Sequence, residues 1–274
     1  MKQSLSALLC ALSIITLSTV SIAGVTTRVT PRVGLVESPD AKNVALLVGV
    51  TYGLPGIDLD LKNVKEIASH PGYRFDTHEL WEDEGVVANV SKNLTDLAAS
   101  IPKGGTLFFY FSGHGSPEGV LMNDRLMTIA EIRAAIEKGR KNKGPLDRLV
   151  MMFDSCYSGA LLDPLRKSML VSTKPLNADS FTENLVSELK AGNRAEQYWK
   201  KLFVFASSRA DETSAAGADG SAFTVSLRKA FDESVLAKST VADFVAKTQK
   251  YTAEYHHPVA RLVPVTMGTE ALVP

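Results

Sequence analysis

Cys156 and His114 are the two side chains whose setting in this chain points to nucleophilic catalysis. Each lies just beyond an apolar run, residues 149–153 (LVMMF) for Cys156 and residues 106–111 (TLFFYF) for His114. A thiol becomes a strong nucleophile when a neighbouring base removes its proton, and imidazole titrates near neutral pH. We therefore interpret the pair as the nucleophile and the acid/base of a cysteine peptidase, with the backbone N–H groups of Gly115 and Cys156 as an oxyanion hole.

Simpler interpretations exist for both residues. A lone cysteine is most often a small buried apolar side chain, but Cys156 stands among Asp, Ser and Gly, outside its apolar run. His114 would otherwise be a polar residue of a Gly-rich turn. The four other histidines lack such a setting, and we expect them to be structural: His70, His78, His256 and His257.

The pattern of the chain predicts strands that alternate with helices. Short apolar runs bounded by Gly, Pro and Asp predict strands at 43–51, 73–80, 106–111, 149–153 and 202–206, and a last, edge strand at 258–265. Apolar periodicity and capping residues predict a first helix that begins at a cap, Asp58 or Asp60, and ends at about residue 69. Further helices are predicted at 82–97, 128–141, 180–190, 222–236 and 241–255. A small hairpin is predicted at 119–127, with its turn at Asn123-Asp124. This order predicts an α/β fold with a mostly parallel central sheet covered by helices on both faces. The carboxyl ends of such strands share one edge, where ligands bind.

Two more residues share the direction of the proposed catalytic pair. Side chains two apart in an extended segment point the same way, so Ser112 accompanies His114 and Asp154 accompanies Cys156. A buried carboxylate is costly unless it is paired. Asp154 either caps a loop or binds a basic substrate side chain, and the spacing leaves both open.

The motifs YFSGHG (110–115) and DSCYSG (154–159) resemble the His and Cys motifs of the caspase-like clan of cysteine peptidases, and most closely those of metacaspases and their bacterial relatives. Residues 44–64, 202–214 and 220–231 extend the resemblance, so it covers roughly 43–265. It implies one caspase-like domain with a Cys156–His114 dyad. It also implies cleavage after Arg or Lys, with Asp60, Ser112 and Asp154 lining the pocket for the basic side chain. Ile57 stands where the family often has a cysteine.

The resemblance also bears on metals and processing. Many metacaspases bind calcium through loop carboxylates, but this chain offers only Glu118, Asp124 and Asp163 there, too few for six oxygens. We therefore expect no metal or other cofactor. The basic segment 163–201 corresponds to the linker between large and small subunits. It holds five candidate self-cleavage points, although a solvated surface would look the same: Arg166, Lys167, Lys174, Lys190 and Arg194.

Composition and the N-terminus set the context. The 274 residues carry 30 basic and 30 acidic side chains, so nothing indicates a nucleic-acid binder. Residues 1–23 have the pattern of a signal peptide, and removal would leave Cys156 as the only cysteine. We expect a secreted or periplasmic protein with no stable membrane association, a polar arm at 24–42 and a peptidase domain at 43–274. Its partners would be peptides with basic residues. Arg28 and Arg32 of the arm are candidate inhibitory pseudosubstrates.

Two rival functions remain. A catalytically silent caspase-like binding or regulatory module would keep the fold, but it would not need both His114 and Cys156. A peptidase of the same clan that prefers Asn or Asp is the other rival, and acidic pocket residues would repel Asp.

Overall fold

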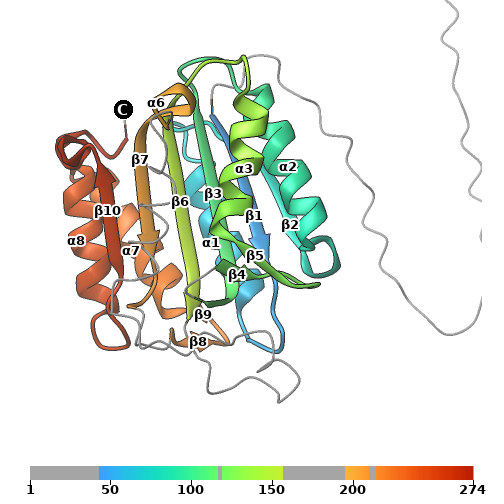
Figure 1. Cartoon of the computed structure of the whole chain (residues 1–274). Coiled ribbons are helices and arrows are strands. Elements are labelled where there is room, and N and C mark those ends of the chain that lie inside the picture. Colours follow the sequence, from blue (N-terminus) through green and yellow to red (C-terminus); the bar gives the residue numbers. More distant parts are fainter. Residues whose placement is uncertain (1–42, 117–118, 157–194, 210–213, 274) are drawn as a thin grey trace, which may run out of the picture. The chain divides into compact units, whose positions relative to one another are not determined.

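A computed structural model describes residues 43–116, 119–156, 195–209 and 214–273 of the protein. The strands of its central sheet follow the order β10–β7–β6–β3–β1–β2 (Figure 1). Its members are β1 (Asn43–Gly49), β2 (Asp76–Trp81), β3 (Thr106–Ser116), β6 (Leu146–Cys156), β7 (Trp199–Ala206) and β10 (Val259–Val263). Neighbouring strands are parallel except β10, which pairs antiparallel with β7 at the edge. The predicted mostly parallel α/β fold is confirmed.

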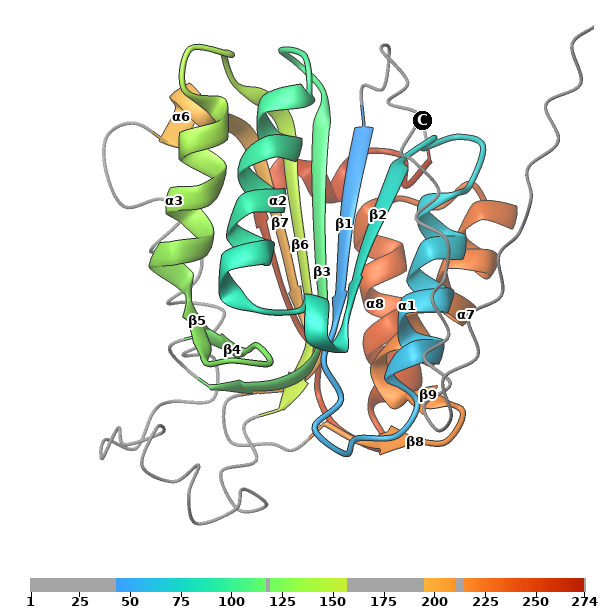
Figure 2. The ribbon, with the colours of Figure 1, turned by 90° about the vertical axis from the view of Figure 1, so that its right-hand side faces the viewer.

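Helices cover both faces of this sheet, as Figure 2 shows. One face carries α2 (Val87–Ser100) and α3 (Ile129–Arg140), and the other carries α1 (Ile57–Ala68), α7 (Ala222–Leu236) and α8 (Val241–Thr252). Shorter elements are η1 (Glu82–Glu84), the hairpin β4 (Gly119–Leu121) and β5 (Leu126–Thr128), α6 (Ala195–Tyr198), the hairpin β8 (Ala216–Gly217) and β9 (Gly220–Ser221), and η2 (Val265–Thr269).

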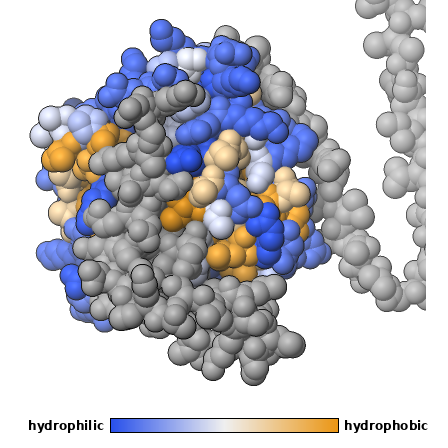
Figure 3. Space-filling view, in the orientation of Figure 1, coloured by the Kyte–Doolittle hydropathy of each residue, from blue (hydrophilic) through white to orange (hydrophobic). Residues whose placement is uncertain are grey.

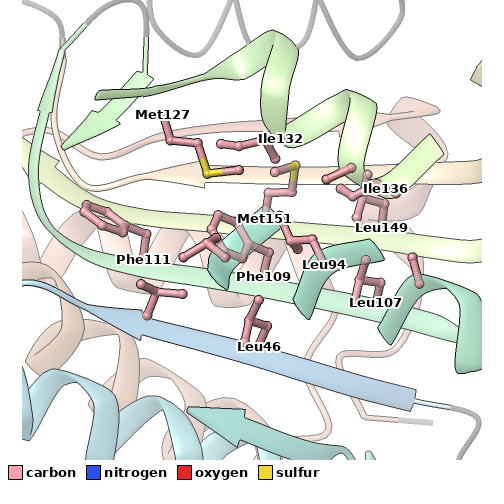
Figure 4. Packing of buried hydrophobic residues seen from close by; sticks show 14 of the residues in the cluster. Leu46, Leu94, Leu107, Phe109, Phe111, Met127, Ile132, Ile136, Leu149 and Met151 are labelled. Atoms are coloured by element: carbon pink, nitrogen blue, oxygen red, sulfur yellow. The ribbon is translucent and has the colours of Figure 1, made fainter. Parts of the chain in front are cut away.

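The strands are apolar on both sides because both sides are buried. Alternate residues of β1 join different cores: Leu46 packs with α2 and α3, and Leu47 packs with α1 and α7. Figure 4 shows Leu46, Phe109 and Met151 of three neighbouring strands packed against Leu94 of α2 and Ile132 of α3. The continuous apolar runs of the sequence therefore reflect burial on two faces.

The exposed side of α2 and α3 is polar. Figure 3 shows mainly hydrophilic residues on the described part of this face, with apolar residues in small separate areas. Helices whose apolar stripe packs on a sheet have this distribution. Within the described ranges, none of the helices combines the length and the apolar character needed to cross a membrane.

Several helix starts differ from the predictions. The N-cap of α1 is Gly56, with a positive φ of 75°, so neither Asp58 nor Asp60 caps the helix. Asp60 lies in the first turn of α1, and its carboxylate accepts hydrogen bonds from Ser112 and Ser221. Glu82–Glu84 forms a separate 3₁₀ turn, and α2 begins at Val87. The predicted capping box of Thr128 is confirmed at the start of α3.

Both motif-bearing strands are longer than predicted. The apolar runs end at Phe111 and Phe153, but pairing continues through the polar residues to Ser116 and Cys156. The residues expected in loops are therefore held in register by the sheet. The predicted helix at 180–190, the segments 1–23 and 24–42, and residues 163–194 of the linker lie outside the described residues, and 195–201 form α6 and the start of β7.

Candidate active site

His114 and Cys156 are direct partners in the pairing of β3 with β6. Neighbouring strands lie about 4.8 Å apart, so the pairing brings the backbones of the two residues together at the carboxyl edge of the sheet. The structure describes only the backbone of Cys156. The His114 ring is buried and lies 6.4 Å from the ring of Tyr52, whose single hydroxyl proton is shared between the carbonyls of Asn123 at 2.7 Å and Met122 at 2.9 Å. The loop after β1 thus packs beside His114.

Gly115 continues β3 beyond His114 and pairs with Val120 of β4. A Cβ atom at Gly115 would lie only 2.7 Å from Oγ of Ser155, which is closer than real contacts allow. The absence of a side chain lets the two strand ends approach each other at this point. The backbone that the sequence predicts as part of an oxyanion hole is therefore tightly enclosed.

The backbone just before Cys156 is held by residues from the end of β7. Ser155 N–H donates to Oγ of Ser207 over 3.2 Å, and this hydroxyl donates to the Ser155 carbonyl over 3.1 Å. Ser208 reaches the same carbonyl at 3.4 Å, and Nδ1 of the buried His256 lies 2.6 Å from the Ser207 carbonyl. Sequence reasoning gave these residues no role, because nothing local to them indicates a contact with Ser155.

Asp60, Ser112 and Asp154 gather in one buried cluster. Ser112 and Asp154 are direct partners across β3 and β6, and Oγ of Ser112 donates to Oδ2 of Asp60 over 2.8 Å. Asp60 and Ser112 have no exposed surface, and Asp154 is only 4% exposed. The structure thus brings these three residues of the sequence prediction together, and their role as a substrate pocket stays a prediction.

Residues from the start of α7 complete the cluster, and sequence reasoning missed them. Ser221 N–H donates to Oδ1 of Asp60 over 2.8 Å, and Ser221 Oγ donates to Oδ2 of Asp154. Thr224 Oγ1 donates to the same Oδ2 over 2.6 Å, and Ser214 Oγ reaches Oδ1 at 3.3 Å. The N-cap position of Ser221 was the one available signal, but a cap indicates a helix start and says nothing about a distant carboxylate.

Both carboxylates of the cluster have raised pKa values, and burial is the main cause for each. Burial, with repulsion by Asp154 as the second cause, raises the pKa of Asp60 to about 8. Burial also raises the pKa of Asp154, against which hydrogen bonds from Ser221 and Thr224 act. A buried pair of acids with raised pKa values favours either a shared proton or a bound cation. The cluster is thus suited to a cationic group.

Other titratable residues take structural positions. His70 lies edge-on to Phe231 with ring centroids 5.5 Å apart, and His78 Nε2 lies 3.4 Å from Oδ2 of Asp76. Asp124 accepts a hydrogen bond from Val87 N–H at the start of α2. Glu118 and Asp163 lie outside the described residues, within which no three His, Cys, Asp or Glu side chains form a group that would hold a metal ion. The expectation of a cofactor-free protein stays a prediction.

An α/β sheet with a histidine and a cysteine paired at its carboxyl edge is the architecture of caspase-like cysteine peptidases. A family model described as the caspase domain matches residues 42–259, so this chain belongs to the caspase-domain family of cysteine peptidases. The resemblance seen in the sequence is confirmed at that level. The expected closeness to bacterial members stays a prediction.

The proteins similar to this chain include a metacaspase and a bacterial protein of known structure. Metacaspase-1 of Mycosarcoma maydis is 27% identical over an alignment of 153 residues, and the match covers 46% of this chain and 38% of the length of that relative. A crystal structure of a Geobacter sulfurreducens protein has a TM-score of 0.58 and 18% identity, and the match covers 81% of this chain and 93% of that one. The second similarity supports the fold alone.

Proposed function

We propose that this protein is a cysteine endopeptidase that cleaves peptide bonds after Arg or Lys. Cys156 is the nucleophile, His114 is the acid/base, and Asp60, Ser112 and Asp154 hold the basic side chain of the substrate. The observation that carries the proposal is the buried pair of carboxylates, one of which, Asp154, stands two residues before Cys156. Membership of the caspase-domain family supports the chemistry.

The proposed reaction uses the pairing of His114 with Cys156. His114 takes the proton of the Cys156 thiol, and the thiolate attacks the carbonyl carbon after the basic residue. The backbone N–H groups of Gly115 and Cys156 donate to the oxyanion that forms. His114 then gives its proton to the leaving amine, and water hydrolyses the acyl-enzyme.

The preference for a basic residue follows from the charge of the cluster. A guanidinium has a planar fork of N–H donors that suits two carboxylates, and an ammonium also supplies a positive charge. An Asp side chain would add a negative charge beside a buried pair of acids that already resists ionisation, and it would be repelled. The raised pKa values of Asp60 and Asp154 mean that binding a cation would release a proton held by the pair.

Hydrolysis of fluorogenic peptides tests the proposal. Four peptides are compared that differ only in having Arg, Lys, Asn or Asp at the cleaved position. The protein should cleave the Arg and Lys peptides in preference to the Asn and Asp peptides. Cys156→Ala should abolish turnover. Parallel assays with calcium and with a chelator address the expected absence of a cofactor. Equal turnover of the Asn peptide would contradict the basic preference. A folded, reduced protein that cleaves none of the four would favour the silent binding module instead.

The proposal includes processing and location. Cleavage after a basic residue of the linker would split the chain. Mass spectrometry of an active sample, compared with Cys156→Ala, tests for this cleavage, and a constant intact mass would exclude it.

If residues 24–42 inhibit the enzyme through Arg28 or Arg32, deleting the arm should raise turnover. Export directed by residues 1–23 predicts a protein outside the cytoplasm whose N-terminus is Gly24.

A further inference from the structure

Ser221 contacts both carboxylates of the acidic cluster with two different groups. Its backbone N–H donates to Oδ1 of Asp60, and its hydroxyl donates to Oδ2 of Asp154. The same hydroxyl accepts from Thr224 N–H over 3.1 Å, because Ser221 is the N-cap of α7. Ser221 and Thr224 are almost completely buried. The first turn of α7 therefore fixes the separation of the two acids.

The hydroxyl of Thr224 has a defined direction. It can donate one proton, and it donates that proton to Asp154. The Tyr110 hydroxyl, 2.7 Å from Oγ1 of Thr224, must then be the donor in their contact. Tyr110 is fully buried on β3. A chain of donors therefore runs from the sheet through Thr224 to Asp154 and holds this carboxylate in one orientation.

These bonds decide which oxygen atoms stay open. Oδ2 of Asp154 accepts from both Ser221 and Thr224, which occupies its two lone pairs. Oδ1 of Asp154 and the two oxygens of Asp60 each accept one bond from a described residue. By the hydrogen bonds of the described residues each of these three oxygens keeps one accepting position, and the Ser221 hydroxyl acts on Asp60 only by lowering its pKa. Three acceptors spread over two carboxylates suit a guanidinium, whose five N–H donors are spread over three nitrogen atoms, better than an ammonium, whose three donors share one nitrogen atom.

We propose that Ser221 and Thr224 are positioning residues that set the preference of this site for Arg over Lys, an inference that rests on the proposed function. They occupy Oδ2 of Asp154, favour the ionised form of that carboxylate, and hold it at a fixed place relative to Asp60. Neither side chain needs to touch the substrate.

The test compares Thr224→Val and Ser221→Ala with wild type on Arg and Lys peptides between pH 6 and 9. Losing one hydrogen bond to a carboxylate should raise KM for the Arg peptide about ten-fold or more, with a smaller change in kcat. The ratio of Arg to Lys turnover should fall. Removing one of these hydrogen-bond donors should raise the pKa of Asp154. As the pH is lowered, KM of the variant should therefore begin to rise at a higher pH than KM of wild type. Thr224→Ser, which keeps the hydroxyl, should restore all three readouts.

Thr248→Val is the matched control. Thr248 is a fully buried threonine of α8 whose hydroxyl donates to the Phe244 carbonyl of its own helix. This variant loses a buried hydroxyl and should leave the Arg-to-Lys ratio and the pH profile unchanged. Ser221→Ala also removes a helix cap, so Thr224→Val separates positioning from stability.

The outcomes are distinct. If wild type cleaves Arg peptides and Thr224→Val keeps its KM, its Arg-to-Lys ratio and its pH profile, the positioning role is wrong and the proposed function stands. If wild type cleaves neither basic peptide, the proposed function fails, and the inference fails with it. A loss in Thr224→Val that Thr224→Ser does not restore would also overturn the inference.

Discussion

The hydroxyl of Ser112 donates to the carboxylate of Asp60 over 2.8 Å, although 52 positions separate the two residues in the sequence. This bond joins the end of β3 to the first turn of α1. It brings Asp60 to Asp154, since Ser112 and Asp154 are partners across two strands. The acidic cluster therefore forms only when α1 packs against the ends of β3 and β6.

Asp60→Asn and Asp154→Asn should each lower kcat/KM for an Arg peptide by about 100-fold, because each removes one of two buried charges facing the substrate cation. Steady-state kinetics measures the effect. Asp58→Asn is the control, since Asp58 is exposed in the same turn of α1 and should keep wild-type activity. Equal losses in Asp58→Asn and Asp60→Asn would contradict a specific role for the cluster.

Stability should respond to pH through the same pair. The pKa of Asp60 is raised from 3.8 to about 8, so between these values the folded protein holds more protons than the unfolded chain. The free energy of unfolding should therefore fall as pH rises, by at most about 1.4 kcal/mol per pH unit for each extra proton. Urea denaturation at several pH values measures this slope. Asp60→Asn should flatten it and be more stable than wild type at pH 8 to 9; an unchanged slope would exclude the raised pKa.

Gly220→Ala should weaken substrate binding. Gly220 has a φ of +107°, and a Cβ atom there would lie 3.0 Å from Oδ1 of Asp60, the atom to which Ser221 donates. Gly104→Ala is the control, since Gly104 also has a positive φ but open space around it. Both variants should lose about 1 kcal/mol of stability from backbone strain, and Gly220→Ala alone should raise KM. A KM that rises equally in both would contradict this view.

Ser207→Ala should lower kcat about ten-fold with little change in KM. It removes two hydrogen bonds to the Ser155 backbone, next to Cys156, and small displacements of a reacting group are costly. Ser234→Ala is the control: Ser234 is fully buried on α7, and its hydroxyl has no hydrogen-bond partner within the described structure. That variant should keep its activity and equal or exceed wild type in stability. The expected split between kcat and KM would be absent if Ser207 served stability alone.

Arg140→Lys should destabilise the fold by about 3 kcal/mol without changing specificity. Arg140 is 1% exposed, and its guanidinium donates to the carbonyls of Ala98, Ile101, Lys143 and Gly144. An ammonium cannot reach this set, and each lost bond leaves a buried carbonyl without a donor. Chemical denaturation measures the loss. Arg125→Lys alters an exposed ion pair with Glu131 and should cost less than about 1 kcal/mol.

Much of the fold was predictable because short apolar runs and capping residues in the sequence mark individual strands and helix starts. Apolar runs buried on two faces predicted β1, β3, β6 and β7, and a Thr–Glu capping box predicted the start of α3. The motifs around His114 and Cys156 predicted that these residues would lie at neighbouring strand ends, and the two residues pair directly across β3 and β6. The strand ends were misplaced, because hydropathy changes at Phe111 and Phe153 while backbone pairing continues past them.

The sequence by itself determined the class of fold and the family, and the family resemblance implied a pocket of Asp60, Ser112 and Asp154. Only the tertiary structure decided what holds that group together. Ser221 is 161 positions from Asp60 and 67 from Asp154, and no periodicity or motif links residues so far apart. Their contact exists because α7 packs beside α1 on one face of the sheet, with its first turn at the carboxyl edge. Local propensities specify each element, but the partners of a buried carboxylate follow from how the elements pack.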